Sequence, residues 1–514
     1  MVSEGKPTYI DDIFAKFDIF ARYHRTLILS IVLAYTTNSM HTANYVFAAE
    51  EVGYRCKDET FANSTCGIIN STSCSDWVYD NPDSFVGEFQ LACQDWKRTL
   101  VGTIHSLAYM VGLLFVGPMS DRLGRKSALI ITGVLGGILG VARSFSPWYW
   151  MYIAFEFLES ALGDSCSPVY VLNIEIIATK KRVPYYLICG MGYSMGGISV
   201  ALIAWQVPYW RDFLRVIYAP ALLFVVFIYL LDESPRWLLT KGKREKAIAV
   251  IEKIANKNNV KIEKTELDNL VCETDDDVMN FGSLLKSTFT SKALFKRFII
   301  CVIWWITSTF VNYGMTINSV SLQGNKYFNY ALISIIDIPG NFVIMYILMK
   351  FRRKLPLIVS FLTAAVFCIT QPFLPNNLPW LSVTMFMAGK FMASLYFSIT
   401  YMYTSELFPT YTRNSMHALC SSLGRIGSIL APQTPLLRVY WPGLPSLIFG
   451  IVSLVAGLVT FAMPDIANDT LPDTVRQAEA LGVKENLGKE IGISYIIPRE
   501  NEEMNDSFQL KNRS

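Results

Sequence analysis

LVGTIHSLAYMVGLLFVGPMSDRLGRKSALIITGVLGGILGVA, residues 100–142, is the stretch that decides the fold. It contains two apolar runs, residues 100–119 and 127–142, which are separated by a short charged sequence. A hydrocarbon layer about 30 Å thick needs about 20 apolar residues in a helix, so the runs predict a pair of membrane helices. Basic residues gather in the short cytoplasmic loops of membrane proteins, which places the sequence DRLGRK on the inner side.

The composition of the whole chain agrees with this reading. The chain has 514 residues, of which 52% are hydrophobic and only 17% are charged. A soluble domain carries about 25% charged residues, so a disordered chain is excluded and a soluble enzyme is disfavoured. The net charge of +3 is too small to indicate nucleic-acid binding. Because no ATP-binding loop, metal-binding motif or catalytic triad pattern stands out, we expect neither an enzyme nor a cofactor or metal.

Twelve apolar runs lie between the charged positions, six in each half of the chain. They cover residues 26–47, 100–119, 127–142, 148–177, 183–207 and 213–231, and then 298–320, 327–349, 355–373, 378–407, 414–437 and 441–463. They predict an all-α membrane protein with twelve transmembrane helices in two six-helix halves. The first residues contain no apolar core and hence no cleavable signal.

The basic residues of the short loops place both termini in the cytoplasm. We therefore expect a cytoplasmic N-terminus, a first half with a large extracellular loop, a cytoplasmic loop with one amphipathic helix, a second half and a cytoplasmic tail. These segments are residues 1–25, 26–231 (with the loop 48–98), 232–297, 298–463 and 464–514.

The predicted extracellular loop has its own signature. It holds Cys56, Cys66, Cys74 and Cys93, together with glycosylation sequons at Asn63 and Asn70. Four cysteines in an oxidising compartment predict two disulfides, with three pairings open. These features predict a glycoprotein of the plasma membrane.

The two halves show a weak internal repeat. EIIATKKR (175–182) and ELFPTYTR (406–413) both place Glu and Arg seven residues apart, and DRLGRK (121–126) has a decayed counterpart in KFRRK (350–354). Two six-helix halves repeated in parallel are typical of secondary transporters, whose substrate site lies between the halves near the midplane.

Several motifs carry a family resemblance. GPMSDRLGRK (117–126) resembles the loop 2–3 motif of the major facilitator superfamily. DESPRWLL (232–239), YTSELFPTYTRN (403–414) and LPDT (471–474) are similar to motifs of its organic-ion branch, solute carrier family 22. The resemblance implies the major facilitator fold, transport by alternating access, and an inner gate closed by charged residues. The gating residues would be Asp121, Arg122, Arg125, Glu175, Arg182, Glu406 and Arg413.

Ionisable residues inside spans are functional candidates, because each costs about 2.5–3.5 kcal/mol on insertion scales. They are Glu156, Glu159 and Asp164 in the fourth span, Asp337 in the eighth, Lys390 in the tenth and Arg425 in the eleventh. Asp337 and Arg425 lie at similar depths when counted from the inner ends, which suggests a pair across the cavity; a purely structural pair is the alternative. Four acids against two bases favour a cationic or zwitterionic substrate.

The resemblance points to the same residues. Asp337 is similar to a cation-coordinating acid of organic cation transporters, whereas Lys390 and Arg425 are similar to basic residues of anion and carnitine transporters. The resemblance implies that Arg425 binds a substrate carboxylate while Asp337 binds a cationic head group, which suits a zwitterion. Trp205 and Tyr313 match aromatic positions that line the family cavity, where a ring stabilises a cation.

The first span adds a polar stripe at helical spacing, which in lipid must face protein or water. Its members are Asn38, His41, Thr42 and Tyr45. We expect this stripe to line the pore, with His41 either a proton relay or a plain hydrogen-bonded residue.

The sequence therefore predicts a membrane transporter of small organic ions, most consistent with cations or carnitine-like zwitterions. A co-transported or exchanged ion is left open. One alternative is an organic-anion exchanger that uses Lys390 and Arg425. Another is a receptor or scaffold that binds without translocation, although such a protein has no need of an inner gate.

Overall fold

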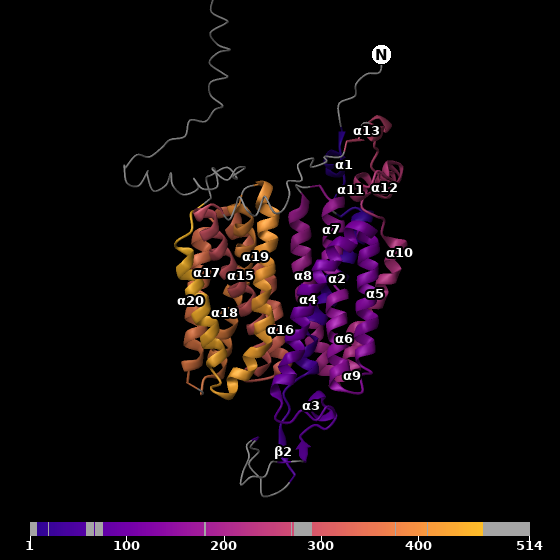
Figure 1. The fold of residues 1–514 in the computed structure, drawn as a ribbon. Helices are drawn as coiled ribbons and strands as arrows, with labels where there is room; N and C mark the ends of the chain where they lie inside the picture. Colours follow the sequence, from indigo (N-terminus) through magenta and orange to yellow (C-terminus); the bar gives the residue numbers. More distant parts are fainter. Residues whose placement is uncertain are drawn as a thin grey trace, which may run out of the picture.

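The computed structural model describes residues 8–18, 20–57, 66, 74, 76–178, 181–268, 270–271, 290–375, 377–408 and 410–465. The predicted glycosylation sites Asn63 and Asn70, the LPDT motif and nearly all of the predicted tail lie outside these residues, as does the side chain of Arg413. Helices form two bundles that stand side by side (Figure 1). We call the end with β2 and α3 the outer end, and the end with α1, α11 and α12 the inner end.

The described residues form six membrane-length helical segments in each half, as the sequence predicts. The N-terminal half contains α2 (Arg22–Ala48), α4 (Asp95–Leu123), α5 (Arg125–Arg143), α6 (Tyr149–Leu162) with α7 (Cys166–Ile176), α8 (Arg182–Gln206), and α9 (Trp210–Tyr218) with η3 (Ala219–Val226) and α10 (Phe227–Leu230). The C-terminal half contains α15 (Lys292–Asn318) with η4 (Ser319–Ser321), α16 (Lys326–Lys350), α17 (Lys354–Thr370) with η5 (Gln371–Phe373), α18 (Pro379–Leu407), α19 (Thr410–Leu430) with η6 (Ala431–Val439), and α20 (Leu444–Thr460).

Eight helices within the described residues are long and apolar enough to cross a membrane by length and composition alone, and α20 is a shorter apolar helix. The other three segments are less apolar or are interrupted, and each has a physical reason for this. The helix α2 carries the polar stripe of the first span, α19 has a large polar share, and the fourth segment is broken. Such residues are tolerated in membrane helices where they face protein or a cavity.

The fourth predicted span is two helices rather than one. The helix α6 ends at Leu162 and α7 begins at Cys166. Between them, the Asp164 carboxylate accepts hydrogen bonds from the Cys166 backbone nitrogen (3.0 Å) and the Ser167 hydroxyl (2.5 Å). The bond from Cys166 satisfies a backbone donor that the start of a helix leaves open. Asp164 is therefore a structural cap in addition to a buried charge.

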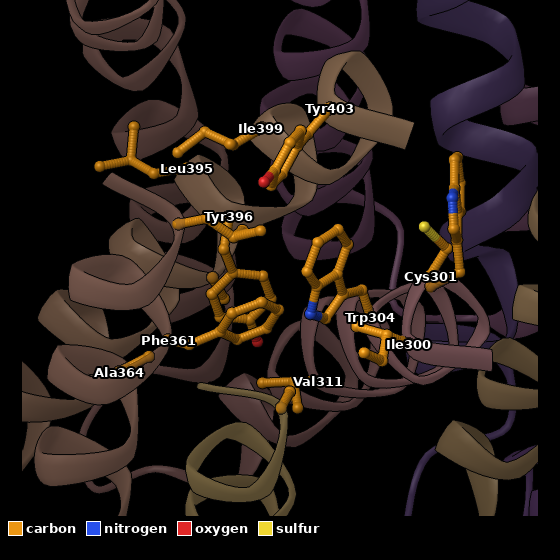
Figure 2. Close-up of a cluster of buried hydrophobic side chains, with 14 of the residues drawn as sticks. Ile300, Cys301, Trp304, Val311, Phe361, Ala364, Leu395, Tyr396, Ile399 and Tyr403 are labelled. Atoms are coloured by element: carbon orange, nitrogen blue, oxygen red, sulfur yellow. The ribbon is translucent and has the colours of Figure 1, made fainter. Parts of the chain in front are cut away.

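Each half has its own core. In the C-terminal half the Trp304 indole stacks on Tyr403 at 5.2 Å and donates a hydrogen bond to the Thr460 hydroxyl at 2.8 Å (Figure 2). The rings of Phe361 and Tyr396 stack at 4.2 Å beside them. Because lipid removes much of the hydrophobic drive between helices, close packing and interhelical hydrogen bonds hold such bundles together.

The inner end of the N-terminal half carries a small cap. It consists of β1 (Thr8–Tyr9), α1 (Ile10–Ala15), α11 (Pro235–Thr240), α12 (Arg244–Asn258), α13 (Lys264–Asp268) and β4 (Leu270–Val271), with β1 and β4 paired in parallel. The amphipathic helix that the sequence predicts is α12, and its Ile251 and Ile254 share a buried cluster with Ile13 and Phe14. The helix α1 and the apolar face of α12 therefore belong to one buried cluster.

The outer loop is attached to the N-terminal half. Its described elements are β2 (Tyr54–Cys56) and β3 (Trp77–Tyr79), which pair antiparallel, and α3 (Phe85–Glu88). Disulfides join Cys56 to Cys74 and Cys66 to Cys93, which selects one of the three possible pairings. The Glu88 carboxylate at the end of α3 accepts hydrogen bonds from Arg211 (2.6 Å) and Tyr209 (2.9 Å).

Candidate functional site

A cavity of about 50 Å³ lies between the two halves, near the middle of the bundle. Helices α2 and α8 of one half and α15, α16 and α18 of the other line it. Its polar lining residues are Ser39, Thr42, Tyr45, Tyr193, Ser194, Asn312, Tyr313, Thr316, Tyr330, Ser334, Asp337 and Lys390. Of the residues selected from the sequence, Tyr313, Asp337 and Lys390 meet here.

Two opposite charges line this cavity. The Asp337 carboxylate accepts a hydrogen bond from the Ser394 hydroxyl at 2.6 Å. The Lys390 ammonium is only 1% exposed and donates to the side-chain oxygen of Asn312 at 2.5 Å. Because hydroxyl and amide dipoles hold each charge in place, both are oriented before a ligand arrives. The cavity therefore offers an anionic and a cationic group to one ligand.

Asp337 and Arg425 do not form the pair expected from their equal depth. The Arg425 guanidinium lies over the ring of Tyr109 on α4, 4.8 Å from its centroid, with Tyr313 and Asp164 as electrostatic neighbours. Depth along a helix says nothing about the direction in which a side chain points. Within the described residues Arg425 thus connects the C-terminal half to Tyr109 of the N-terminal half.

The polar stripe of the first span is split between two faces of α2. Thr42 and Tyr45 line the cavity, and Asn38 accepts a hydrogen bond from Thr42 at 3.4 Å. His41 instead faces into the N-terminal half, where its ring stacks on Tyr218 at 4.0 Å. The expectation that the whole stripe faces the pore is therefore wrong for His41, and Asn38 is also outside the described lining of the cavity.

Trp205 also departs from expectation. Its side chain is 59% exposed at the outer end of α8, and it is not among the lining residues of either cavity in the described part of the chain. A Trp at the end of a membrane helix suits the aromatic belt at the lipid interface, which explains this position without a ligand.

One further buried base lies in the N-terminal half. The predicted spans 127–142 and 148–177 leave Arg143 in an outer loop, but it ends α5 with 0% exposure and pairs with Glu156. Counting Arg143 lowers the excess of buried acids over bases from two to one. The excess also lies away from the cavity, because Glu156 and Glu159 face Arg143 inside the N-terminal half. The sequence signal for this burial is a pair of glutamates spaced i and i+3, Glu156 and Glu159, in the span that follows Arg143.

The charged motifs of the inner end pair within each half. Arg125 contacts Asp121 at 2.5 Å and Glu175 at 3.2 Å, all in the N-terminal half. Arg353 contacts Glu406 at 3.3 Å in the C-terminal half.

The DESPRWLL motif, which overlaps α11, contacts the charged cluster around Arg125. The Glu233 carboxylate accepts from the backbone nitrogens of Arg125 and Lys126 at 2.8 and 3.0 Å. Of the other predicted gate residues, Arg122 is exposed at the end of α4 and Arg182 is half-buried at the start of α8.

Contacts across the two halves close the outer end. Glu50 follows α2 and forms an ion pair with Lys326 of α16 at 2.5 Å. Thr99 of α4 donates to Gln433 of η6 at 3.0 Å, and Gln433 donates to Thr103 at 2.6 Å. A vestibule of about 400 Å³ lies beside these contacts and includes Glu50 and Lys326 in its lining. Glu50 and Gln433 are not among the residues predicted from the sequence; the signal that could have found them is a polar residue at the outer end of a span, where few charges occur.

Comparison with known proteins gives consistent matches. Residues 33–475 match the family described as "Sugar (and other) transporter". The chain is 31% identical over 427 residues to solute carrier family 22 member 3 of Mus musculus, covering 82% of this chain and 76% of that protein. It is 32% identical over 409 residues to solute carrier family 22 member 1 of Bos taurus, covering 79% and 72%.

The organic cation transporter protein of Drosophila melanogaster is 30% identical over 427 residues, covering 80% of this chain and 77% of that protein. Among solved structures, the partially occluded inward-open xylose transporter XylE from E. coli superposes with a TM-score of 0.61 at 16% identity. That superposition covers 87% of this chain and 100% of the other, and it shows a shared fold.

Proposed function

Because the chain belongs to solute carrier family 22 within the sugar (and other) transporter family, we propose that it carries small organic zwitterions across the plasma membrane. The protein is a membrane transporter of small organic ions that works by alternating access, and it is not an enzyme. The proposal concerns the charge of its substrate, the membrane in which it acts and the residues that bind.

The opposite charges in the central cavity carry this proposal. Asp337 faces a cationic head group, and Lys390 faces a carboxylate of the same molecule. Tyr313 and Tyr330 in the same lining supply aromatic faces for the cationic end. A simple cation would leave Lys390 unpaired in a desolvated site, and a simple anion would leave Asp337 unpaired, both of which are unfavourable.

The closed outer end supports the alternating-access part of the mechanism. This conformer holds its two halves together at Glu50 and Lys326, whereas the inner charged clusters pair within each half. The cavity of about 50 Å³ is too small for an organic ion, so substrate entry requires the halves to move apart. In the opposite conformer we propose that the inner clusters, including Arg122, Arg182 and Arg413, close the gate.

The relatives favour a second candidate. Their names include an organic cation transporter, and Asp337 with the cavity tyrosines suits a quaternary ammonium ion as well as a zwitterion. In this case Lys390 would remain bonded to Asn312 and take no part in binding.

Uptake by purified protein in liposomes separates these candidates. We expect saturable uptake of carnitine that exceeds uptake of tetraethylammonium, with little uptake of a dicarboxylate such as glutarate. Tetraethylammonium uptake without carnitine uptake would support the pure cation transporter. Uptake of glutarate alone would support the anion exchanger, and binding of a probe without uptake would support a receptor. Empty liposomes and Glu245→Gln, which changes an exposed acid of α12, serve as controls.

The membrane topology and glycosylation of the protein are part of the same proposal. We propose that the disulfide-bonded loop lies outside the cell with glycans on Asn63 and Asn70, and that both termini lie in the cytoplasm. A terminal tag should then bind antibody only after permeabilisation. Glycosidase treatment should shift the mobility of the wild type but not of an Asn63→Gln/Asn70→Gln variant. A glycan on Asn468 would contradict this orientation.

A further inference from the structure

A second group of ionisable side chains lies inside the N-terminal half. Its members come from five helices: His41 of α2, His105 of α4, Arg143 of α5, Glu156 and Glu159 of α6, and Tyr218 of α9. Each is at most 6% exposed. None of the six is among the described residues that line the central cavity, so substrate binding does not explain the group.

The charges of the group do not balance. Arg143 supplies one positive charge, and the two glutamates supply two negative charges when both are ionised. With neutral histidines the group carries one excess negative charge at a site that is buried in this conformer. A buried charge without a partner is unfavourable, and burial favours the neutral form of a carboxyl group. One bound proton makes the group neutral.

The hydrogen bonds indicate which carboxyl group holds this proton. Glu156 contacts the Arg143 guanidinium, faces His105 Nδ1 at 2.8 Å and accepts from Asn44 at 3.5 Å. Glu159 is less compensated: its Oε2 atom is 3.9 Å from Arg143 Nη1, whereas Glu156 Oε2 lies directly against that nitrogen. Neither Oε2 atom has a further hydrogen bond among the described residues. Its Oε1 atom is 3.8 Å from His41 Nδ1.

The other neighbours of Glu159 do not supply the missing positive charge. The Tyr218 hydroxyl faces it and is itself bonded to Arg143 at 3.1 Å. The rings of Tyr152 and Tyr218 both lie about 5 Å from the Arg143 guanidinium, at 5.1 and 5.0 Å. The titratable and charged groups that surround Glu159 are therefore His41, His105, Arg143, Tyr152, Glu156 and Tyr218.

A metal ion is the competing occupant. His105, Glu156 and Glu159 could each offer a ligand atom, and these atoms lie within 4.8 Å of one another. However, the Arg143 guanidinium already sits against Glu156. A divalent cation would face this fixed positive charge at short range, whereas a proton on Glu159 would not displace it.

The helix α2 connects this group to the transport cavity. His41 contacts Glu159, while the next residue, Thr42, lines the cavity. Tyr45, one turn further along α2, also lines the cavity and has its ring centroid 6.1 Å from that of His105. A proton that joins or leaves Glu159 changes the charge that faces His41, and α2 carries that change to the cavity wall.

We propose that this group is a proton-binding site, that its exchangeable proton resides on Glu159, and that proton occupancy controls the rate of transport through α2. The control of transport rests on the proposed function, whereas proton binding by Glu159 does not.

Infrared titration of the purified protein tests proton binding directly. A buried protonated carboxyl gives a C=O stretching band that shifts in D2O. We expect the wild type to show such a band with pH-dependent intensity, Glu159→Gln to lose it, and the surface control Glu245→Gln to keep it. If Glu159→Gln does not fold, Glu159→Asp should keep the band at a shifted frequency. No titrating band in the wild type, or an unchanged band in the Glu159 variants, would overturn the proposal.

Carnitine uptake measured across a pH series tests the coupling. We expect wild-type uptake to change with pH, and uptake by Glu159→Gln to lose that dependence and match the acidic limit of the wild type. A variant that keeps the full pH dependence would overturn the coupling. Absence of uptake of every probe by the wild type would refute the proposed function, and the infrared result would then decide the proton site alone. One equivalent of zinc in the wild type that is lost in Glu159→Gln, measured by mass spectrometry, would identify a metal site instead.

Discussion

Glu50 and Lys326 join the two halves of the transporter at their outer end, with 2.5 Å between the carboxylate and the ammonium. One residue follows the first membrane helix and the other begins the eighth. The pair is about one-third exposed on each side, at 34% and 36%, so water and salt screen it. It therefore suits a contact that must break in every transport cycle.

Loss of this pair should favour opening of the outer end. A partly exposed ion pair contributes up to about 1 kcal/mol, so Glu50→Gln should raise the outward-open population by at most about fivefold. A thiol at Ile317→Cys, which lines both cavities, should then react faster with a membrane-impermeant reagent. Lys253→Ala removes an exposed pair with Asp232 at the inner end and is the matched control. Equal labelling rates in all three proteins would show that the pair does not restrain the halves.

Substitutions in the cavity should separate substrates by charge. Asp337→Asn should weaken binding of both tetraethylammonium and carnitine by about ten- to a hundredfold, because a charge-assisted contact contributes about 1.5–3 kcal/mol. Lys390→Met should weaken carnitine but spare or improve tetraethylammonium. The measurement is inhibition of uptake, normalised to the amount of folded protein. Thr384→Ala, on the exposed face of the Lys390 helix, should change neither. A similar loss for both probes in both variants would refute the binding site.

Arg425 should behave differently from Lys390. Its guanidinium stacks on Tyr109 of the opposite half, and a desolvated cation–π contact contributes about 2 kcal/mol. Arg425→Gln should therefore slow uptake of carnitine and tetraethylammonium to the same extent, and Tyr109→Leu should do the same. A selective loss of carnitine in Arg425→Gln would instead show that this residue binds the substrate carboxylate.

The attachment of the N-terminal segment should depend on apolar packing more than on its ion pair. Phe14 is 1% exposed, and Phe→Ala substitutions in a core cost about 3–5 kcal/mol. The Lys16–Glu266 pair is 39% and 29% exposed and contributes less than about 1 kcal/mol. Hydrogen exchange of α1 and α12 should accelerate strongly in Phe14→Ala and only slightly in Lys16→Ala. The reverse order would show that the ion pair holds the segment.

The same ion pair predicts a pH response. The hydrogen bond from Lys16 lowers the pKa of the Glu266 carboxyl below its ordinary value of 4.5. A lowered pKa in the folded state means that the contribution is complete above the ordinary value and is lost as the pH falls through the lowered one. The protection of α13 from hydrogen exchange that this pair provides should therefore stay constant around neutral pH and should be lost only in acid. Glu266→Gln should remove the acid response.

The sequence predicted the elements well because span length and loop charge are local properties. The twelve segments, the amphipathic helix α12 and the cavity residues Asp337 and Lys390 follow from counting apolar runs and buried charges. The errors concern direction around a helix. His41 and Thr42 are neighbours in the chain and face different parts of the protein, while Asp337 and Arg425 share a depth and have different partners.

Two other features, the burial of Arg143 and the helix break at Asp164, were not predicted because they depend on tertiary contacts. Arg143 ends its helix among Glu156 and two tyrosine rings, so its burial depends on residues of two other helices. The break at Asp164 needs the side chain itself to cap the next helix. Neither feature changes the apolar pattern of a span, so hydropathy alone does not predict either of them.

The outer loop is bonded through Glu88 to Arg211 and Tyr209 of the N-terminal half, and two disulfides brace it internally. The loop therefore moves together with the N-terminal half throughout the transport cycle. A fluorescent dye carried by an antibody fragment against this loop would mark the position of that half. With a second dye on the outer end of α20, the distance between the two dyes would report opening and closing of the outer end in single molecules. Neither dye would lie in the transport path.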